Sequence, residues 1–128
     1  MRVLLDTVTF LWVIEGSERL SRSALAIFRA PENEVYLSVV SSWEISVKHQ
    51  LGSLPLPQRP ERFVPAMREE HLVESLPLVE SATLQLGKLP ALHRDPFDRM
   101  LICQAIDGGL TILTPDERIR QYPVSSAW

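Results

Sequence analysis

This sequence of 128 residues has only one cysteine, no long apolar run and no excess of positive charge. A single cysteine, Cys103, excludes a disulfide scaffold and indicates a protein from a reducing compartment. Because Cys103 lies within an apolar run, we expect it to be a small buried side chain. No apolar run approaches the roughly 18 residues needed to span a membrane. The N-terminus lacks a signal-peptide pattern, so we expect a cytoplasmic protein. With a formal net charge of −3, a polyanionic partner requires a local basic patch or bound cations.

Short apolar runs alternate with helical patterns along the whole chain, which predicts one α/β domain over residues 1–128 with a short parallel sheet covered by helices on both faces. The predicted strands are residues 3–5, 35–38, 76–79 and 110–113. Helices are expected between Asp6 and Gly16, over 21–30, from Ser41 to Leu51, from Pro60, over 81–87, from Pro96 to Gly108, and briefly before an edge segment at 122–128. Four aromatic side chains are expected in the core: Phe10, Trp12, Trp43 and Phe63.

The stretch from Asp95 to Asp98 reads as the start of a buried helix. Asp95 suits the N-cap, Pro96 the first helical position, and Asp98 the third, near free backbone N–H groups. Capping and the helix dipole account for both acids, together on the order of 1–2 kcal/mol. The alternative is that one of them binds a metal ion.

Four acids spread over the chain are predicted to meet at one edge of the sheet. Asp6 follows the first strand and Asp116 follows the last, while Glu44 and Asp98 lie in the first turns of two helices. Carboxyl ends of strands and N-termini of helices collect at the same edge of such a sheet. Each acid also has a local explanation: Asp6 and Asp116 as helix caps, Glu44 in a capping box with Ser41, and Asp98 as a complement to the helix dipole.

Carboxylates crowded at one edge repel each other unless a cation lies among them. Oxygen ligands without histidine or cysteine favour Mg²⁺ or Mn²⁺ over zinc. A carboxylate-bound Mg²⁺ that keeps water ligands is suited to the hydrolysis of phosphate esters. Taken together, the four acids therefore favour a metal site suited to phosphate-ester hydrolysis over four separate local explanations.

At these acids the sequence resembles PIN-domain ribonucleases, specifically the VapC-type toxins of bacterial type II toxin–antitoxin pairs. Four blocks carry the resemblance in order: residues 4–7 with 10–12, residues 42–45 with Lys48, residues 93–99, and residues 111–114 with Asp116. Close relatives often carry histidine after Asp-Thr, whereas this chain has Val8, which can neither ligate a metal nor transfer a proton. No role is assigned to Val8.

The resemblance implies a PIN-like fold and a Mg²⁺-dependent (or Mn²⁺-dependent) endoribonuclease. Such enzymes cut single-stranded or looped RNA and leave a 3′-hydroxyl and a 5′-phosphate. Asp6, Glu44 and Asp98 are implied to hold the metal, with Asp116 completing or positioning the site. The resemblance also implies a homodimer, and a cognate antitoxin whose C-terminal segment packs across helices near the site and blocks it.

Several neighbours of the acids are candidates for supporting roles. Thr7 and Thr114 carry hydroxyls that can hold the carboxylates. Asp95 is interpreted first as a helix cap and second as an accessory acid of the site. His93 is interpreted as a loop residue rather than a metal ligand.

The basic residues near the acids have two interpretations each. Lys48 lies four residues after Glu44, which suits a helix ion pair worth roughly 0.2–0.5 kcal/mol or a place near the scissile phosphate. Arg94 and Arg99 either pair with Asp95 and its neighbours or grip RNA phosphates. The sequence alone leaves both choices open.

Three other functional classes compete with a nuclease. A phosphoaspartyl enzyme of the dehalogenase type needs a second aspartate where Val8 stands. A receiver-like signalling domain needs an early acidic pair and a late lysine, and neither is in place. A PIN scaffold without catalysis, retained as a protein-binding module, is the alternative that only an assay separates from the enzyme.

Overall fold

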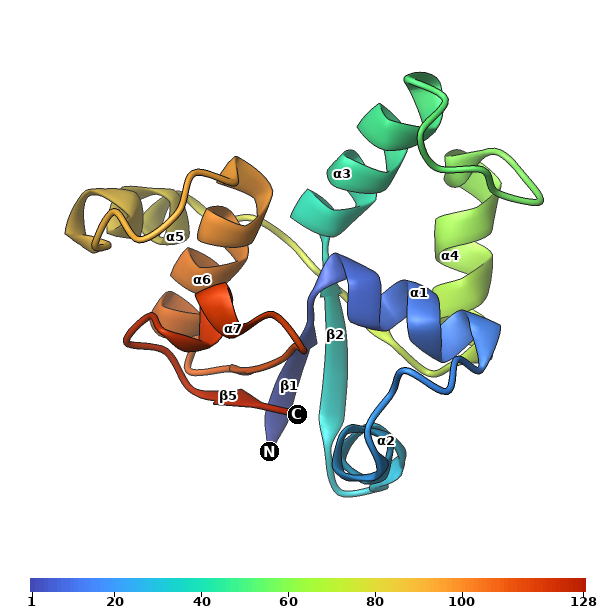
Figure 1. The fold of residues 1–128 in the computed structure, drawn as a ribbon, viewed down its shortest axis with the longest axis horizontal. Helices are drawn as coiled ribbons and strands as arrows, with labels where there is room; N and C mark the ends of the chain where they lie inside the picture. The colour runs from blue at the N-terminus through green and yellow to red at the C-terminus, as the bar shows by residue number, and fades with distance from the viewer.

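Five parallel strands form the centre of the computed structural model, which describes all 128 residues (Figure 1). The strands are β1 (Arg2–Leu5), β2 (Glu34–Ser38), β3 (Glu74–Leu76), β4 (Thr111–Leu113) and β5 (Ser126–Ala127), in the order β3-β2-β1-β4-β5. In the central strand, Leu4 pairs with Tyr36 of β2 and with Ile112 of β4. Helices cover both faces, so residues 3–5 are completely buried. The predicted α/β class is confirmed.

Seven α-helices and one 3₁₀ helix surround the sheet. They are α1 (Thr7–Glu15), α2 (Arg22–Arg29), α3 (Val39–Gln50), α4 (Pro60–Glu70), α5 (Glu80–Leu84), η1 (Gln85–Lys88), α6 (Pro96–Gly108) and α7 (Glu117–Arg120). Figure 1 shows α5, α6 and α7 on one side of β1 and β2, with α1, α2 and α4 on the other. Successive strand side chains point to opposite faces, so Val3 and Leu5 join the core under α1, α2 and α4, while Leu4 joins the core under α6 and α7.

The helix boundaries follow local sequence signals in most places. Helix α6 begins at Pro96 after the Asp95 cap and ends at Gly109, whose φ of 66° is left-handed, and α1 ends at Gly16 with φ 64°. The third strand lies at 74–76 instead of the predicted 76–79. Pro77 follows it and has no N–H to donate to the ladder.

Helix α3 begins earlier than predicted. It starts at Val39, and its N-cap is Ser38, whose hydroxyl accepts a hydrogen bond of 2.9 Å from the Val40 N–H. The expected capping box of Ser41 and Glu44 is therefore wrong, because both residues lie inside the helix. Strand β2 runs directly into α3 without a loop, so the last strand residue takes the capping role.

The aromatic side chains divide between core and surface. Phe10 and Phe63 are buried as predicted, and Trp12 is half-buried against the Trp128 ring. Trp43 is 59% exposed, so its predicted place in the core is wrong. Its ring instead meets Phe97 edge-on at a centroid distance of 4.8 Å. Trp43 lies on the outer face of α3, while Ile45 turns into the core.

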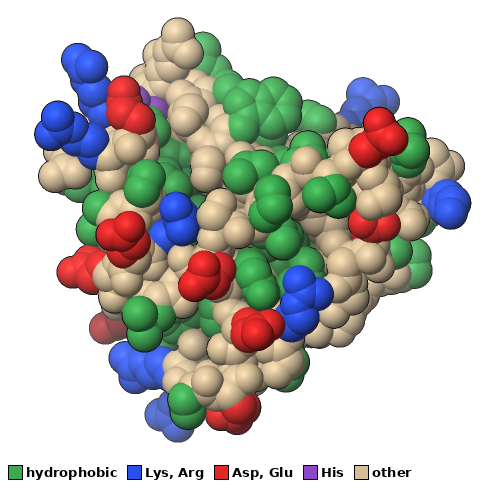
Figure 2. All heavy atoms as spheres, turned by 180° about the vertical axis from the view of Figure 1, so that it is seen from behind, with side chains coloured by type: hydrophobic (Ala, Val, Ile, Leu, Met, Phe, Trp, Pro, Cys, Tyr) green, Lys and Arg blue, Asp and Glu red, His purple; other side chains and the backbone are tan.

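Acidic and basic side chains are mixed over the molecular surface shown in Figure 2, without a broad field of one sign. This agrees with the small net charge. None of the helices combines the length and apolarity needed to cross a membrane.

Candidate functional site

The fold brings the four predicted acids to the carboxyl end of the central strands. Asp6 directly follows β1, Asp116 caps α7 beyond β4, and Asp98 lies in the first turn of α6. Glu44 lies in the second turn of α3 and not in its first. The starts of α1, α3 and α6 lie at the same end of the sheet (Figure 1). All four carboxylates are close enough to interact, since the other three each raise the pKa of Asp98.

Asp6 is buried and held by two short hydrogen bonds. Its Oδ1 accepts from the Thr9 backbone N–H at 2.9 Å, which makes it the cap of α1, and its Oδ2 accepts from the Thr114 hydroxyl at 2.6 Å. Burial raises the pKa of Asp6, and the bond from Thr114 opposes that rise. The Thr114 hydroxyl also accepts from the Asp116 N–H at 3.0 Å, so Thr114 connects Asp6 to Asp116.

Glu44 is buried and paired on both carboxylate oxygens. The Thr7 hydroxyl donates to Oε1 at 2.6 Å, and the Lys48 ammonium forms an ion pair with Oε2. The Thr7 hydroxyl also lies 2.9 Å from that of Ser41. A hydroxyl has one proton, so Thr7 gives it to the carboxylate and accepts from Ser41. The hydrogen bond to Glu44 raises the pKa of Lys48, whose side chain is 47% exposed.

Asp95 and Asp98 occupy different environments, although both lie at the start of α6. The Oδ1 of Asp95 accepts from the backbone N–H groups of Phe97 at 2.9 Å and Asp98 at 3.2 Å, as its predicted role as a cap requires. The Asp98 side chain is only 15% exposed and accepts no backbone hydrogen bond. Burial raises the pKa of Asp98 to about 7, with further increases from Asp95, Glu44, Asp6 and Asp116. Asp95 therefore starts the helix, while Asp98 is held among like charges.

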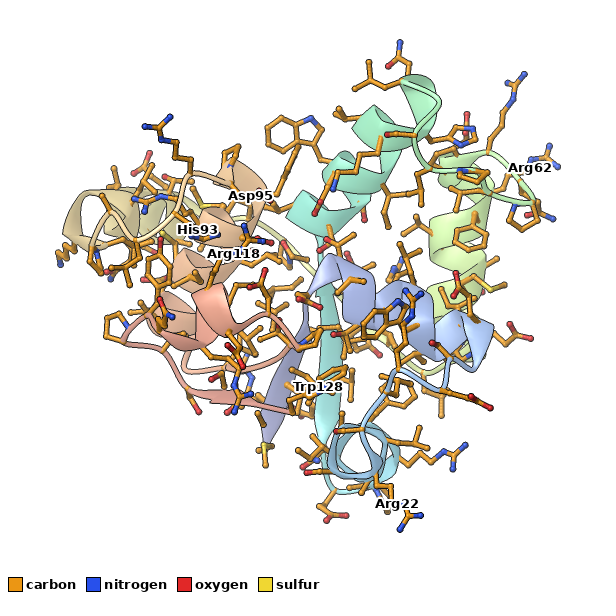
Figure 3. The ribbon with its side chains drawn as sticks, in the orientation of Figure 1. Arg22, Arg62, His93, Asp95, Arg118 and Trp128 are labelled. Atoms are coloured by element: carbon orange, nitrogen blue, oxygen red, sulfur yellow. The ribbon has the colours of Figure 1, made fainter.

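Asp116 is engaged by a neighbouring arginine. Its Oδ1 lies 3.2 Å from Arg118 Nε and its Oδ2 lies 3.0 Å from Arg118 Nη2. These bonds lower the pKa of Asp116. His93, Asp95 and Arg118 lie near one another around the start of α6 (Figure 3). With both oxygens bound by Arg118, Asp116 is better placed to support Asp6 through Thr114 than to contact an ion directly.

A histidine and a tyrosine complete the surroundings of Asp98. His93 Nε2 lies 3.4 Å from Asp98 Oδ2, and His93 Nδ1 lies 2.8 Å from the Tyr122 hydroxyl. His93 is a loop residue, as interpreted from the sequence. The sequence did not predict a role for Tyr122 at this site. Tyr122 lies 29 residues after His93, and no local pattern connects these two residues.

The two arginines near the start of α6, Arg94 and Arg99, have different surroundings. The Nη1 of Arg99 donates to the Pro90 carbonyl and the Tyr122 hydroxyl, both at 3.0 Å, so this side chain braces the loop before α6. Arg94 is exposed and forms no ion pair. Neither arginine forms an ion pair with Asp95 or with another acid near it, so the predicted ion pairing is wrong for both.

The acids fit a hard divalent cation by their chemistry. They provide carboxylate oxygens only, without thiolates, and the raised pKa of Asp98 reflects repulsion that a cation would relieve. The structure holds no group of three or more histidine, cysteine, aspartate or glutamate side chains at metal-ligating separations. Binding a cation would therefore draw these side chains closer together.

A surface groove lies away from the acids. It is a groove of about 820 Å³ between α3 and α4, lined by His49, Arg59 and Arg68 among others. None of the four acids lines it. The acids and this groove thus lie on different sides of α3.

Comparison with known proteins gives the family. The sequence matches the PIN domain family over residues 3–124. A search of curated proteins finds no significant match.

Solved structures with the same fold include toxin–antitoxin complexes. VapBC2 from Rickettsia felis, bound to a promoter DNA fragment, contains a chain that superposes with a TM-score of 0.75 at 13% identity, over 100% of this chain and 99% of that one. VapBC from Salmonella typhimurium, bound to DNA, gives 0.68 at 16% identity, and VapBC-1 from nontypeable Haemophilus influenzae gives 0.65 at 19%; each comparison covers 99% of this chain and 97% of the other. At these identities the likeness concerns the fold. Together with the match to the family over nearly the whole sequence, it shows that this chain belongs to the PIN domain family.

Proposed function

We propose that this protein is a metal-dependent endoribonuclease that acts as the toxin of a type II toxin–antitoxin pair. The observation that carries the proposal is the convergence of Asp6, Glu44 and Asp98 at the carboxyl end of β1, with the pKa of Asp98 raised to about 7. Buried like charges destabilise the folded protein through their mutual repulsion. A cation bound among the acids would offset this repulsion for all of them, so a cation-binding site accounts for their shared placement.

In this proposal Asp6, Glu44 and Asp98 hold Mg²⁺ or Mn²⁺, directly or through water. An ion held by these residues would neutralise phosphate charge and would activate a water molecule for attack. Asp116 supports Asp6 through the Thr114 hydroxyl. Three carboxylates therefore hold the ion, and Asp116 positions one of them.

Two basic residues are placed to meet the RNA. The Lys48 ammonium pairs with Glu44 but is half exposed, so it can turn toward a phosphate beside the acids. Arg94 is exposed next to the start of α6 and has no acidic partner. Arg99 is not free for this task because its guanidinium braces the loop before α6.

The proposed partners follow from the family and its neighbours. Several solved structures of the same fold are complexes named VapBC, and two of those described above contain DNA. For this chain we propose a cognate antitoxin whose C-terminal segment covers the acids, and a homodimer in the cytoplasm. Copurification of the chain with the product of an adjacent gene tests the antitoxin.

The nuclease activity is tested by incubating total RNA with purified wild-type protein, with and without EDTA, and mapping the ends of the products. Asp98→Asn removes one acid of the site, and Asp107→Asn makes the same change at the other end of α6, where Asp107 accepts from the Ser81 hydroxyl. We expect wild type and Asp107→Asn to cleave RNA, leaving 3′-hydroxyl and 5′-phosphate ends. Asp98→Asn and the EDTA-treated protein should be inactive.

Cleavage by Asp98→Asn at the wild-type rate, or in the presence of EDTA, would contradict the metal site. If every RNA stays intact with wild-type protein while the antitoxin still binds, the chain is the non-catalytic PIN scaffold. That second function has no observation in its favour beyond the fold.

A further inference from the structure

We propose that Tyr122 and His93 are positioning residues for Asp98. The Tyr122 hydroxyl holds the neutral His93 ring with its proton on Nε2, and this N–H orients the Asp98 carboxylate. The metal-binding consequence rests on the proposed function, whereas the arrangement of protons can be tested without it. The geometry of the three side chains carries the argument.

The hydrogen bonds of Tyr122 determine where the protons lie. Its hydroxyl receives the His93 backbone N–H at 3.1 Å and Arg99 Nη1 at 3.0 Å, and both of these groups can only donate. Both lone pairs of the hydroxyl are then used. Its single proton remains for His93 Nδ1, 2.8 Å away, so Nδ1 is an acceptor and carries no proton. Tyr122 is buried, so water does not offer another arrangement.

The ring proton of a neutral His93 must therefore be on Nε2. This atom lies 3.4 Å from Asp98 Oδ2, and the two side chains are 7% and 15% exposed. It provides the only hydrogen bond that the Asp98 side chain receives. Asp98 otherwise faces like charges that would turn its carboxylate away. A donor fixed by a buried network sets the orientation in which Asp98 meets a cation.

The other two histidines provide internal controls, because their rings require the opposite tautomer. His49 Nδ1 lies 3.0 Å from the Leu54 carbonyl oxygen, and His71 Nδ1 lies 2.9 Å from that of Met67. A carbonyl oxygen only accepts, so in both rings Nδ1 carries the proton. The protein contains three histidines, of which His93 alone should be protonated on Nε2.

The arrangement is tested by ring ¹⁵N NMR at about pH 8.5, above the usual titration range of imidazole. His93→Gln assigns the His93 signals. We expect an Nε2–H tautomer for His93 and Nδ1–H tautomers for the other two. Asp98→Asn should shift the His93 Nε2–H resonance and leave the other two rings unchanged. An Nδ1–H tautomer for His93, or a resonance unmoved by Asp98→Asn, overturns the proposal.

The consequence for Asp98 is tested by Mn²⁺ titration calorimetry. His93→Leu removes the donor and should weaken Mn²⁺ binding roughly tenfold, while His93→Gln keeps an N–H in a similar place and should stay within about threefold of wild type. Tyr122→Phe, which retains the ring packing, should lie between them. His71→Leu, directly after α4, is the matched control and should bind as wild type does. Circular dichroism confirms that each variant is folded.

The outcomes separate this inference from the proposed function. Equal Mn²⁺ affinities of His93→Leu and wild type, or equal losses in His93→Leu and His93→Gln, overturn the positioning role even if RNA is cleaved. If the wild type neither binds Mn²⁺ nor cleaves RNA, the proposed function fails. In that case the NMR result decides whether Tyr122 and His93 orient Asp98.

Discussion

Two acids three positions apart show how strongly the environment decides what a residue does. Asp95 points its carboxylate at the free N–H groups of α6, whereas the carboxyl of Asp98 is buried near four other acids, whose charges raise its pKa. A carboxylate that accepts backbone N–H groups is stabilised in its charged form. One that is buried among like charges is not. The same residue type therefore serves as a structural cap at one position and as a candidate ligand at the next turn.

Substitutions of Asp95 separate its two contributions. Asparagine also caps helices, so Asp95→Asn should cost only a few tenths of a kcal/mol in the free energy of unfolding, whereas Asp95→Ala should cost about 1 kcal/mol. Both substitutions remove a charge that raises the pKa of Asp98. The optimum of cleavage should then extend to lower pH in both. Urea unfolding and pH–rate profiles measure the two effects, and equal destabilisation by asparagine and alanine would contradict the capping role.

The raised pKa of Asp98 makes stability depend on pH in a definite direction. The pKa is about 7 in the folded protein and about 4 in the unfolded chain, so the folded state holds the proton more tightly. Protonated Asp98 therefore stabilises the folded state. This contribution to the free energy of unfolding is complete below about pH 4, and on the order of 2–4 kcal/mol is lost as the pH rises toward 7. Asp98→Asn should remove this part of the pH dependence.

Urea unfolding of both proteins in EDTA, from pH 4.5 to 7.5, measures the difference. The comparison with the variant matters because other groups titrate in the same range. A wild-type protein that gains stability relative to Asp98→Asn as the pH rises would show that the folded environment favours the charged form.

At the scale of single elements, helix α3 determines the position of Glu44 and provides its partner Lys48. Its cap at Ser38 starts the helix at the sheet edge, so Glu44 lies in the second turn and faces Thr7 of α1. Lys48 follows one turn later on the same side. The spacing of four residues between Glu44 and Lys48 is compatible with both interpretations of Lys48, the helix ion pair and the contact with an RNA phosphate. The structure shows the ion pair, and the phosphate contact remains a proposal.

Lys48→Gln distinguishes the two roles. Because Lys48 is half exposed, losing the pair should cost no more than about 1 kcal/mol. If the ammonium also meets RNA, KM should rise roughly five- to tenfold. Lys88→Gln in η1, which changes the only other lysine, is the control. An unchanged KM in Lys48→Gln would leave only the helix ion pair.

At the scale of the whole molecule, the site joins segments from both ends of the chain. The bond from Thr114 to Asp6 spans 108 residues and joins the ends of two paired strands. A ligand held by these segments should stabilise the entire fold, because their arrangement exists only in the folded protein.

Divalent cations should therefore raise the melting temperature. At a concentration one hundred times the dissociation constant, Mn²⁺ should add about 2.7 kcal/mol to the free energy of unfolding. The effect should be larger at pH 7.5 than at pH 5.5, where protonation of Asp98 competes with the ion. Differential scanning calorimetry measures both. An equal increase in Asp98→Asn would place the cation elsewhere on the protein.

Much of the fold follows from local sequence. The apolar run at residues 3–5 predicted the central strand, and Asp95, Pro96 and Gly109 marked the two ends of α6. These signals are local because a cap, a proline and a left-handed glycine act within one turn of the backbone. The sequence misplaced the start of α3 at Ser41 because the true cap, Ser38, is the last residue of β2, and the end of that strand is decided by its pairing in the sheet.

The sequence by itself determined which acids share an edge of the sheet, because the carboxyl ends of parallel strands and the N-termini of the connecting helices lie at the same edge. Only the tertiary structure decided what each side chain touches. In the structure Phe10 is buried and Trp43 is exposed. The Arg99 guanidinium binds the loop before α6, and Tyr122 is hydrogen-bonded to His93, 29 residues earlier in the sequence. Such contacts depend on the packing of segments that are distant in sequence, and a local pattern carries no information about them.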